Sequence, residues 1–352
     1  MTDPAKPDAL LDPDELKPVA ALAGRLLSQV DAMLLGRPGL HRLVLIGILS
    51  RGHVLLEGVP GVGKTALVKA LSQLLGLEFK RVQFTPDLMP GDILGAHILQ
   101  ETPGAGREMV FTPGPVFTNL LLADEINRAS PKTQSALLEA MQERNVTLLG
   151  ATRSLPNPFF LLATQNPIEL EGTYPLPEAQ LDRFLFKLVV DPADVDALDR
   201  IISTRRRGEP PTPTWAMTAD ELRQVFAVMD RVYLPRPVSR YIARLVASTH
   251  VTAADAPPLV KAYVAYGASP RAAIAIAEAA RAAALLEGRP TVGFADVQMV
   301  APPVLIHRLI LNYKARLDSV DAVAVVGELL RTLDVAGVNL PRDLAIAEAN
   351  HA

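Results

Sequence analysis

The chain has 352 residues, of which 49% are hydrophobic and 21% charged, and its formal net charge is -3. This balance supports sizeable buried cores and excludes a largely disordered protein, and the charge provides no global field to attract nucleic acid. The absence of cysteine excludes disulfides and thiolate metal sites. With no signal peptide and no apolar run of about 18 residues, we expect a cytoplasmic protein without a membrane span.

The first part of the chain predicts an α/β domain over residues 15–190, after a flexible tail over 1–14. Helical spacing runs from about 15 to 49 and is interrupted near 36–39. Short apolar runs at 53–57, 120–123, 159–163 and 184–190 predict strands, and 79–84 is predicted to be a further strand. Helices at 65–75 and 131–144 fall between them, and this alternation indicates a parallel sheet covered on both faces.

Two insertions are predicted within this domain. Residues 86–117 are rich in proline and glycine, and they predict a short helix at about 90–94 followed by a hairpin that turns at 103–106. Residues 145–156 alternate in polarity and turn at Gly150, which predicts a second hairpin.

The composition changes after residue 190. A proline-rich stretch at 208–214 marks a linker over 191–214, and residues 215–352 are predicted to be all helical. Thr218 and Glu221 form a capping-box pattern. Further helices are expected at 271–286 and at 319–333, where Ser319 is the expected N-cap.

The strongest chemical signal is the segment 58–65, which matches G-x-x-x-x-G-K-[ST] between a predicted strand and a predicted helix. Its glycines let backbone N–H groups surround phosphate oxygens, while the lysine adds positive charge and the threonine can ligate Mg²⁺. The residues predicted to bind nucleotide are Gly58, Val59, Pro60, Gly61, Val62, Gly63, Lys64 and Thr65.

A second signal is the apolar strand 120–123 followed by two acids, Asp124 and Glu125. Asp124 is predicted to hold Mg²⁺, together with Thr65, and Glu125 to act as the general base for an attacking water. Paired acids at the end of a strand can also form a solvated turn. The phosphate-binding motif upstream favours the catalytic interpretation.

With these motifs the chain resembles AAA+ ATPases, and within them the MoxR family, over about residues 20–340. The stretches that carry the resemblance are Gly58–Thr65, Ala123–Ala129, Ala163–Pro167, Glu171–Phe184 and Gly267–Arg271. The resemblance implies a P-loop parallel-sheet domain followed by an all-helical lid domain. It also implies ATP hydrolysis with ATP and Mg²⁺ as ligands, and assembly into a homo-oligomeric ring, a hexamer. The implied role is chaperone-like remodelling or maturation of other protein complexes, with client proteins that include partners carrying a von Willebrand factor A domain.

Three further catalytic residues are implied only by the resemblance. Asn166 would be the first sensor, Arg183 an arginine finger that acts in the neighbouring subunit, and Arg271 the second sensor. Asparagine before proline also suits a simple turn, and an exposed ion pair with Asp182 is the alternative for Arg183. An arginine near a helix N-terminus is unfavourable for the helix dipole, which favours a functional reason for Arg271. Residues 86–117 resemble the family's insertion in helix two, and 145–156 the hairpin before the first sensor.

Two other functions stay open at this point. One is the ATPase subunit of a metal chelatase, which has a similar core and similar insertions. The other is a nucleic-acid motor of the same clade, against which the net charge and the lack of basic and aromatic stripes argue. The residues themselves identify no client.

Overall fold

The computed structural model describes residues 10–102, 106–167, 172–205 and 210–334. The chain divides into two compact units: Met1–Val232 with Ala282–Pro290, and Tyr233–Arg281 with Thr291–Ala352. Four predicted segments lie wholly or partly outside the described residues: the tail at 1–9, the hairpin turn at 103–105, the linker at 206–209 and the end of the helical domain at 335–352.

A five-stranded parallel sheet forms the centre of the first unit, in the order β2-β5-β8-β1-β9. The strands are β1 (Val54–Glu57), β2 (Phe79–Gln83), β5 (Leu120–Asp124), β8 (Phe160–Gln165) and β9 (Phe186–Val189). Their positions confirm the predicted strands to within two residues. Because all five run in one direction, their carboxyl ends meet at one edge of the sheet, where open α/β sheets bind ligands.

Helices cover both faces of this sheet. Leu55, Leu121 and Leu161 belong to a core cluster that also contains Leu137 of α5 (Pro131–Glu143). Phe160 points to the opposite face, because side chains alternate along a strand. There the centre of its ring lies 6.4 Å from that of Phe226 of α8 (Ala219–Met229). The helices of this unit are α1 (Pro13–Met33), α2 (Pro38–Leu49), α3 (Lys64–Leu75), α4 (Pro90–Leu94), α5 (Pro131–Glu143), α6 (Glu178–Leu181), α7 (Val195–Thr204) and α8 (Ala219–Met229), with a 3-10 turn at Ile126–Arg128.

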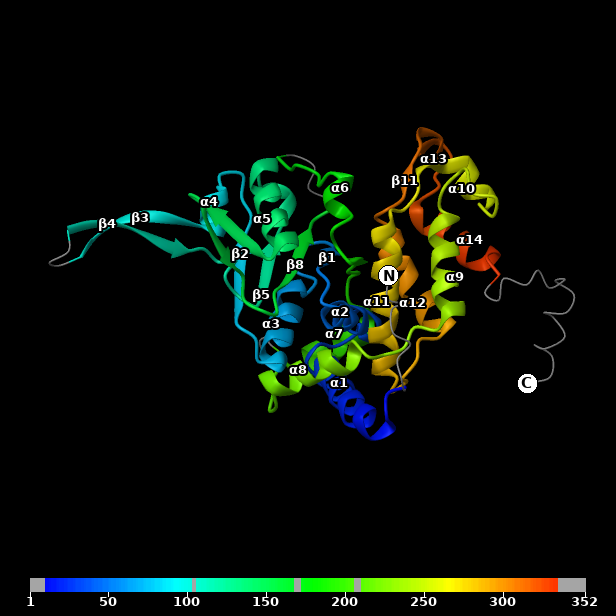
Figure 1. Cartoon of the computed structure of the whole chain (residues 1–352), viewed down its shortest axis with the longest axis horizontal. Helices are drawn as coiled ribbons and strands as arrows, with labels where there is room; N and C mark the ends of the chain where they lie inside the picture. The colour runs from blue at the N-terminus through cyan, green and yellow to red at the C-terminus, as the bar shows by residue number, and fades with distance from the viewer. Residues whose placement is uncertain (1–9, 103–105, 168–171, 206–209, 335–352) are drawn as a thin grey trace, which may run out of the picture. The chain divides into compact units, whose positions relative to one another are not determined.

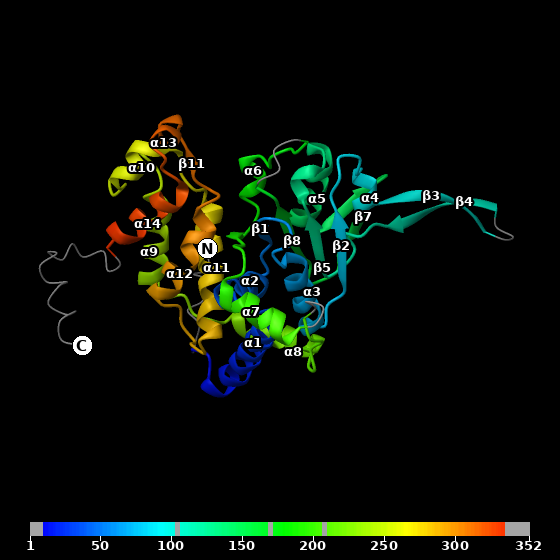
Figure 2. The same cartoon turned by 180° about the vertical axis from the view of Figure 1, so that it is seen from behind.

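Both predicted hairpins are present, and they contact each other. The first pairs β3 (Gly95–Thr102) with β4 (Gly106–Pro113) and extends away from the sheet, as both views show (Figures 1 and 2). The second pairs β6 (Asn145–Leu148) with β7 (Ala151–Ser154) and turns at Gly150, whose φ is 78°. The guanidinium of Arg153 lies 3.9 Å from the ring centre of Phe111, so a cation–π contact joins the two hairpins.

The first unit extends further along the chain than the sequence indicated. Helix α7 lies inside the expected linker 191–214, and α8 packs on the first unit rather than opening the second. The N–H of Met217 donates to the carbonyl of Leu74 at 2.7 Å, and Arg51 pairs with Asp230 at 2.6 Å. Because of these contacts, the boundary between the two units lies between Val232 and Tyr233, and not between residues 214 and 215 as the sequence predicted.

In the part of the second unit that the structure describes, one small ribbon accompanies the helices. The helices of this unit are α9 (Arg236–Ala247), α10 (Pro258–Tyr263), α11 (Pro270–Leu286, whose last turn belongs to the first unit), α12 (Phe294–Leu305), α13 (Tyr313–Leu317) and α14 (Ala322–Thr332). The expectation of an all-helical domain missed β10 (Val264–Tyr266) and β11 (Ile310–Leu311), which pair antiparallel. Across the described ranges, no helix combines the length and apolarity needed to cross a bilayer.

The predicted N-cap of the last helix was also wrong. Asp321 caps α14 by accepting a hydrogen bond from the N–H of Ala324 at 2.8 Å. Ser319 instead has a φ of 53°, in the left-handed region, and lies in the turn after α13. An N-cap residue has an extended backbone, so Ser319 cannot serve as one in this conformation.

Candidate active site

The glycine-rich loop follows β1 at the carboxyl edge of the sheet and leads directly into α3. Gly61 and Gly63 have φ values of 81° and 88°, which glycine adopts without strain. At Gly58 an added Cβ would lie 2.6 Å from the carbonyl oxygen of Val190, so no larger residue fits. The predicted loop is therefore present, with the N-terminus of α3 at its end.

Lys64 is folded back into this loop and is only 9% exposed. Its Nζ donates hydrogen bonds to the carbonyls of Gly58 at 2.5 Å and Val59 at 3.4 Å. Burial lowers the pKa of Lys64, and the nearby carboxylates of Asp124 and Glu125 oppose that shift. A phosphate in the loop would offer this ammonium a charged acceptor in place of neutral carbonyls.

Asp124 ends β5 and is 8% exposed. Its Oδ1 accepts a hydrogen bond from the Thr164 hydroxyl at 2.6 Å, and its Oδ2 accepts one from Nη2 of Arg81, also at 2.6 Å. The Thr164 hydroxyl in turn accepts from the backbone N–H of Glu125 at 2.8 Å. Both acids are thus fixed by side chains of the neighbouring strands β2 and β8.

Glu125 has a strained backbone, with φ 57° and ψ 49°. This left-handed conformation is uncommon for residues other than glycine, costs about 1–3 kcal/mol and is found preferentially at functional sites. Its Oε2 accepts hydrogen bonds from Nε2 of Gln83 at 2.7 Å and from Nη1 of Arg128 at 3.0 Å. The carboxylate is therefore oriented from two sides.

A polar hollow of about 330 Å³ brings these groups together. Asn166, which directly follows β8, also lines it and is buried. The complete lining consists of Pro60, Gly61, Gly63, Lys64, Thr65, Arg81, Gln83, Asp124, Glu125 and Asn166. Sequence reasoning missed Arg81, Gln83 and Thr164. For the first two, the available signal was the polar end of the strand 79–84, next to the strand that carries the acids.

The oxygen groups in the polar hollow suit a phosphate-bound Mg²⁺ ion. Thr65 and Asp124 supply a hydroxyl and a carboxylate, the hard ligands that this ion prefers. Within the described residues, no group of three or more His, Cys, Asp or Glu side chains could hold a metal alone. Mg²⁺ characteristically takes one or two carboxylates and completes its shell with water and substrate phosphates.

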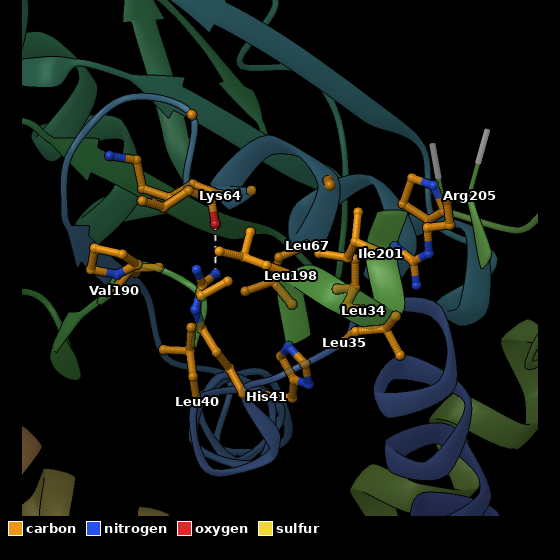
Figure 3. A pocket seen from close by; sticks show the side chains of 18 of the residues that line it. Leu34, Leu35, Leu40, His41, Lys64, Leu67, Val190, Leu198, Ile201 and Arg205 are labelled. Atoms are coloured by element: carbon orange, nitrogen blue, oxygen red, sulfur yellow. Dashed lines mark hydrogen bonds between the residues drawn. The ribbon is translucent and has the colours of Figure 1, made fainter. Parts of the chain in front are cut away.

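Figure 3 shows a second, apolar hollow of about 470 Å³. The two share Pro60, Gly61, Gly63 and Lys64 as a common wall. The apolar side chains around it include Leu34, Leu35, Leu40, Val190, Leu198 and Ile201. Nη1 of Arg37, in the connection between α1 and α2, donates to the carbonyl of Val62 at 2.6 Å and ties this region to the loop. Sequence reasoning missed the apolar hollow, since its wall comes from three separate segments.

Comparisons with known proteins agree with this geometry. Residues 53–186 match the model of the ATPase family associated with various cellular activities (AAA), and residues 258–329 match that of the AAA lid domain. Chaperone MoxR1 of Mycobacterium tuberculosis (strain ATCC 25618 / H37Rv) is 44% identical over 329 residues, which cover 93% of this chain and 85% of that protein. The chain belongs to the MoxR family of AAA+ ATPases.

Two further relatives support this membership. Protein MoxR of Paracoccus denitrificans is 33% identical over 305 residues, or 80% of this chain and 87% of that protein. A crystal structure from Cytophaga hutchinsonii ATCC 33406 superposes with a TM-score of 0.83 at 37% identity, covering 91% of this chain and 97% of that chain. The resemblance seen in the sequence is confirmed, and with it the ATPase activity of the family.

Arg183 does not join the polar hollow of this MoxR-family ATPase. It precedes β9, and β9 runs parallel to β1, so Arg183 lies at the amino edge of the sheet. The four residues of β9 alone separate the two edges by about 13 Å. Nη1 of Arg183 donates to the carbonyl of Leu138 in α5 at 3.0 Å.

Arg271 lies in the second unit, where it is an exposed residue in the first turn of α11. Its role as the second sensor stays a prediction.

Proposed function

We propose that this chain hydrolyses Mg-ATP, with the triphosphate in the polar hollow and the base in the apolar hollow. The observation that carries this proposal is the convergence of Lys64, Asp124, Glu125 and Asn166 on one hollow at the carboxyl edge of the sheet. The shared wall of the two hollows is the phosphate loop. A nucleotide can therefore span both of them while its phosphates contact the loop.

The proposed reaction is attack of a water oxygen on the γ-phosphorus. The bond between this phosphorus and the bridging oxygen breaks, ADP and phosphate leave, and the proton of the water passes to the Glu125 carboxylate. Gln83 and Arg128 orient that carboxylate. Lys64 neutralises charge on the phosphates, and Asn166 positions the water or the γ-phosphate. Mg²⁺, held by Thr65 and Asp124, would supply further positive charge to the phosphate oxygens.

The active form in this proposal is a ring, most simply a hexamer. The position of Arg183 supports it, because a residue at the amino edge is too far from its own polar hollow to contact a phosphate there. In a ring with head-to-tail contacts, the amino edge of one subunit can face the nucleotide of the next. Arg183 would then stabilise the charge of the transition state in the neighbouring site.

The proposed cellular role is remodelling or maturation of other protein complexes in the cytoplasm, where ATP is supplied. Support comes from a relative, MoxR1, which is named a chaperone. The extended β3–β4 hairpin offers a surface remote from the nucleotide site, with Ile98, Leu99 and Met109 about half exposed. A client carrying a von Willebrand factor A domain is the partner we propose.

A trapping experiment tests this role. Glu125→Gln should hold ATP and its client together, so affinity purification with Mg-ATP should recover a von Willebrand factor A partner. Recovery should fall when EDTA or ADP replaces Mg-ATP, and the matched surface variant Glu139→Gln should capture less. Equal recovery under all conditions, or no such partner, would contradict the proposed role while leaving the ATPase activity untouched.

A further inference from the structure

His41 stands at the end of the apolar hollow away from Lys64 (Figure 3). It is a residue of α2 and is only 4% exposed. Its Nδ1 lies 2.7 Å from Oδ1 of Asp31 in α1. An apolar wall needs no polar side chain, so a buried imidazole that contacts both a carboxylate and the hollow indicates a further role.

The contact with Asp31 decides which ring nitrogen carries the proton. A carboxylate only accepts hydrogen bonds, so Nδ1 of His41 must be the donor in this pair. Burial lowers the pKa of His41, so the ring is neutral near pH 7 and Nε2 keeps its lone pair. No described residue hydrogen-bonds to Nε2, which leaves this acceptor to the hollow.

The order of the parts of a nucleotide corresponds to this arrangement. In the proposed ATP complex the phosphates lie at the loop that carries Lys64, and the base lies at the opposite end of the molecule. Figure 3 shows His41 and Lys64 at opposite ends of the hollow, with Leu198 between them. The base is thus the part of the nucleotide that meets His41.

We propose that Nε2 of His41 accepts a hydrogen bond from the exocyclic amino group of adenine and thereby selects adenine over guanine nucleotides. This inference rests on the proposed function. Adenine carries an amino donor at C6, whereas guanine carries a carbonyl acceptor there. Guanine would place two acceptors against each other in a buried site, and a buried acceptor left unpaired is costly. Asp31 is the positioning residue, since it fixes the proton on Nδ1.

Nucleotide competition against a fluorescent ADP analogue tests this assignment without relying on turnover. The ligands are ADP, GDP and purine riboside diphosphate, which lacks the amino group at C6. Wild-type protein should bind ADP roughly tenfold more tightly than purine riboside diphosphate, the effect of one buried hydrogen bond, and GDP more weakly still. His41→Phe keeps a ring but removes the acceptor, so it should bind ADP and purine riboside diphosphate equally.

The affinities that His41→Phe loses distinguish recognition of the amino group from a general effect of His41 on packing. The assignment predicts that His41→Phe weakens only ADP binding and leaves the affinity for purine riboside diphosphate unchanged. Equal weakening of both ligands, or discrimination that survives the substitution, would overturn it. If His41→Phe does not fold, Asp31→Ala is the second variant. Without Asp31 the proton is no longer fixed on Nδ1 of His41, so the difference in affinity between ADP and purine riboside diphosphate should decrease. Asp14 is an exposed acid on the same helix, and Asp14→Ala should leave this difference unchanged.

The same assay distinguishes failure of this inference from failure of the proposed function. If Lys64→Ala binds ADP as tightly as wild-type protein, or if wild-type protein binds none, the nucleotide site itself is wrong. If ADP binds through the loop and His41 has no effect on base preference, only the role of His41 is wrong.

Discussion

Lys64 and Glu125 both line the polar hollow, but the proposed mechanism gives them different roles, nucleotide binding for Lys64 and hydrolysis for Glu125. Lys64 is held inside the loop by backbone carbonyls, ready to exchange them for phosphate oxygens. Glu125 is fixed by Gln83 and Arg128 on a strained backbone. Substitution of the first should therefore affect binding, and substitution of the second should affect turnover.

Lys64→Ala should weaken ATP binding by about 10- to 100-fold, the loss expected for a charged hydrogen bond. Titration calorimetry measures the affinity directly. Lys69→Ala is the matched control, because Lys69 is an exposed lysine on the same helix. Equal affinities of the Lys64 variant and wild-type protein would contradict the assignment of the phosphate loop.

Glu125→Gln should keep ATP affinity and lose about 10²- to 10⁴-fold in turnover, the usual effect of removing a general base. The substituted amide has the same shape but cannot take the proton of the water. Steady-state phosphate release gives the rate, and Glu139→Gln on the surface of α5 serves as control. A variant that turns over at the wild-type rate would show that another residue activates the water.

The motif residues were predictable because their chemistry depends on local spacing. Residues 58–65 and the pair Asp124 and Glu125 are contiguous in sequence, and the parallel sheet brings them to one edge. The polar end of the strand 79–84 was the signal available for Arg81, but its contact with Asp124 and the role of Thr164 appear only when β2 and β8 flank β5. The apolar hollow was missed for the same reason.

At the scale of elements, His53 joins two strands of the sheet. Its Nδ1 accepts a hydrogen bond from the N–H of Leu161 in β8 at 3.0 Å, just before β1 begins. Burial, and secondly the charge of Arg144, lower the pKa of His53 from 6.5 to about 4. The folded protein therefore holds this imidazole neutral under conditions where an unfolded chain would protonate it.

The free energy of unfolding should consequently fall as the pH drops from 6.5, the ordinary pKa of histidine, toward about 4, the pKa of His53 in the folded protein. In that window the unfolded state binds more protons, and the loss amounts to up to about 3 kcal/mol. His53→Asn keeps an acceptor near the Nδ1 position but does not titrate there. Urea unfolding at several pH values should give this variant a flatter profile of stability against pH than wild-type protein. Parallel profiles for wild type and His53→Asn would contradict this account.

Most elements followed from periodicity, and the exceptions have tertiary causes. Strands β1, β5 and β8 are mostly apolar, so their positions were plain in the sequence, whereas β2 alternates apolar residues with Lys80, Arg81 and Gln83. The β10–β11 ribbon contains only three and two residues, too few for a periodic signal. The assignment of α8 to the first unit depends on its packing against distant residues such as Leu74 and Arg51, which no local pattern reveals.

At the scale of the whole molecule, the site is incomplete in one chain if Arg183 is the finger. Its place at the amino edge of the sheet requires a neighbour to bring it to a nucleotide. Arg183→Ala should therefore retain nucleotide binding and lose about 10³- to 10⁵-fold in hydrolysis. The contact of Arg183 with the Leu138 carbonyl makes a check of folding necessary, which circular dichroism provides.

The most direct test of the ring mechanism mixes two inactive proteins, Arg183→Ala and Glu125→Gln. In a mixed ring, an Arg183→Ala subunit keeps its own Glu125, and a Glu125→Gln neighbour can supply Arg183. When equal amounts of the two variants mix at random, about one quarter of the interfaces contain both an intact Glu125 and an intact Arg183. The restored ATPase activity should be highest in this equal mixture and lower when either variant is in excess. Phosphate release across mixing ratios should follow this curve, with light scattering confirming that mixed rings form. A flat baseline at every ratio, despite mixed rings, would contradict a finger supplied by the neighbouring subunit.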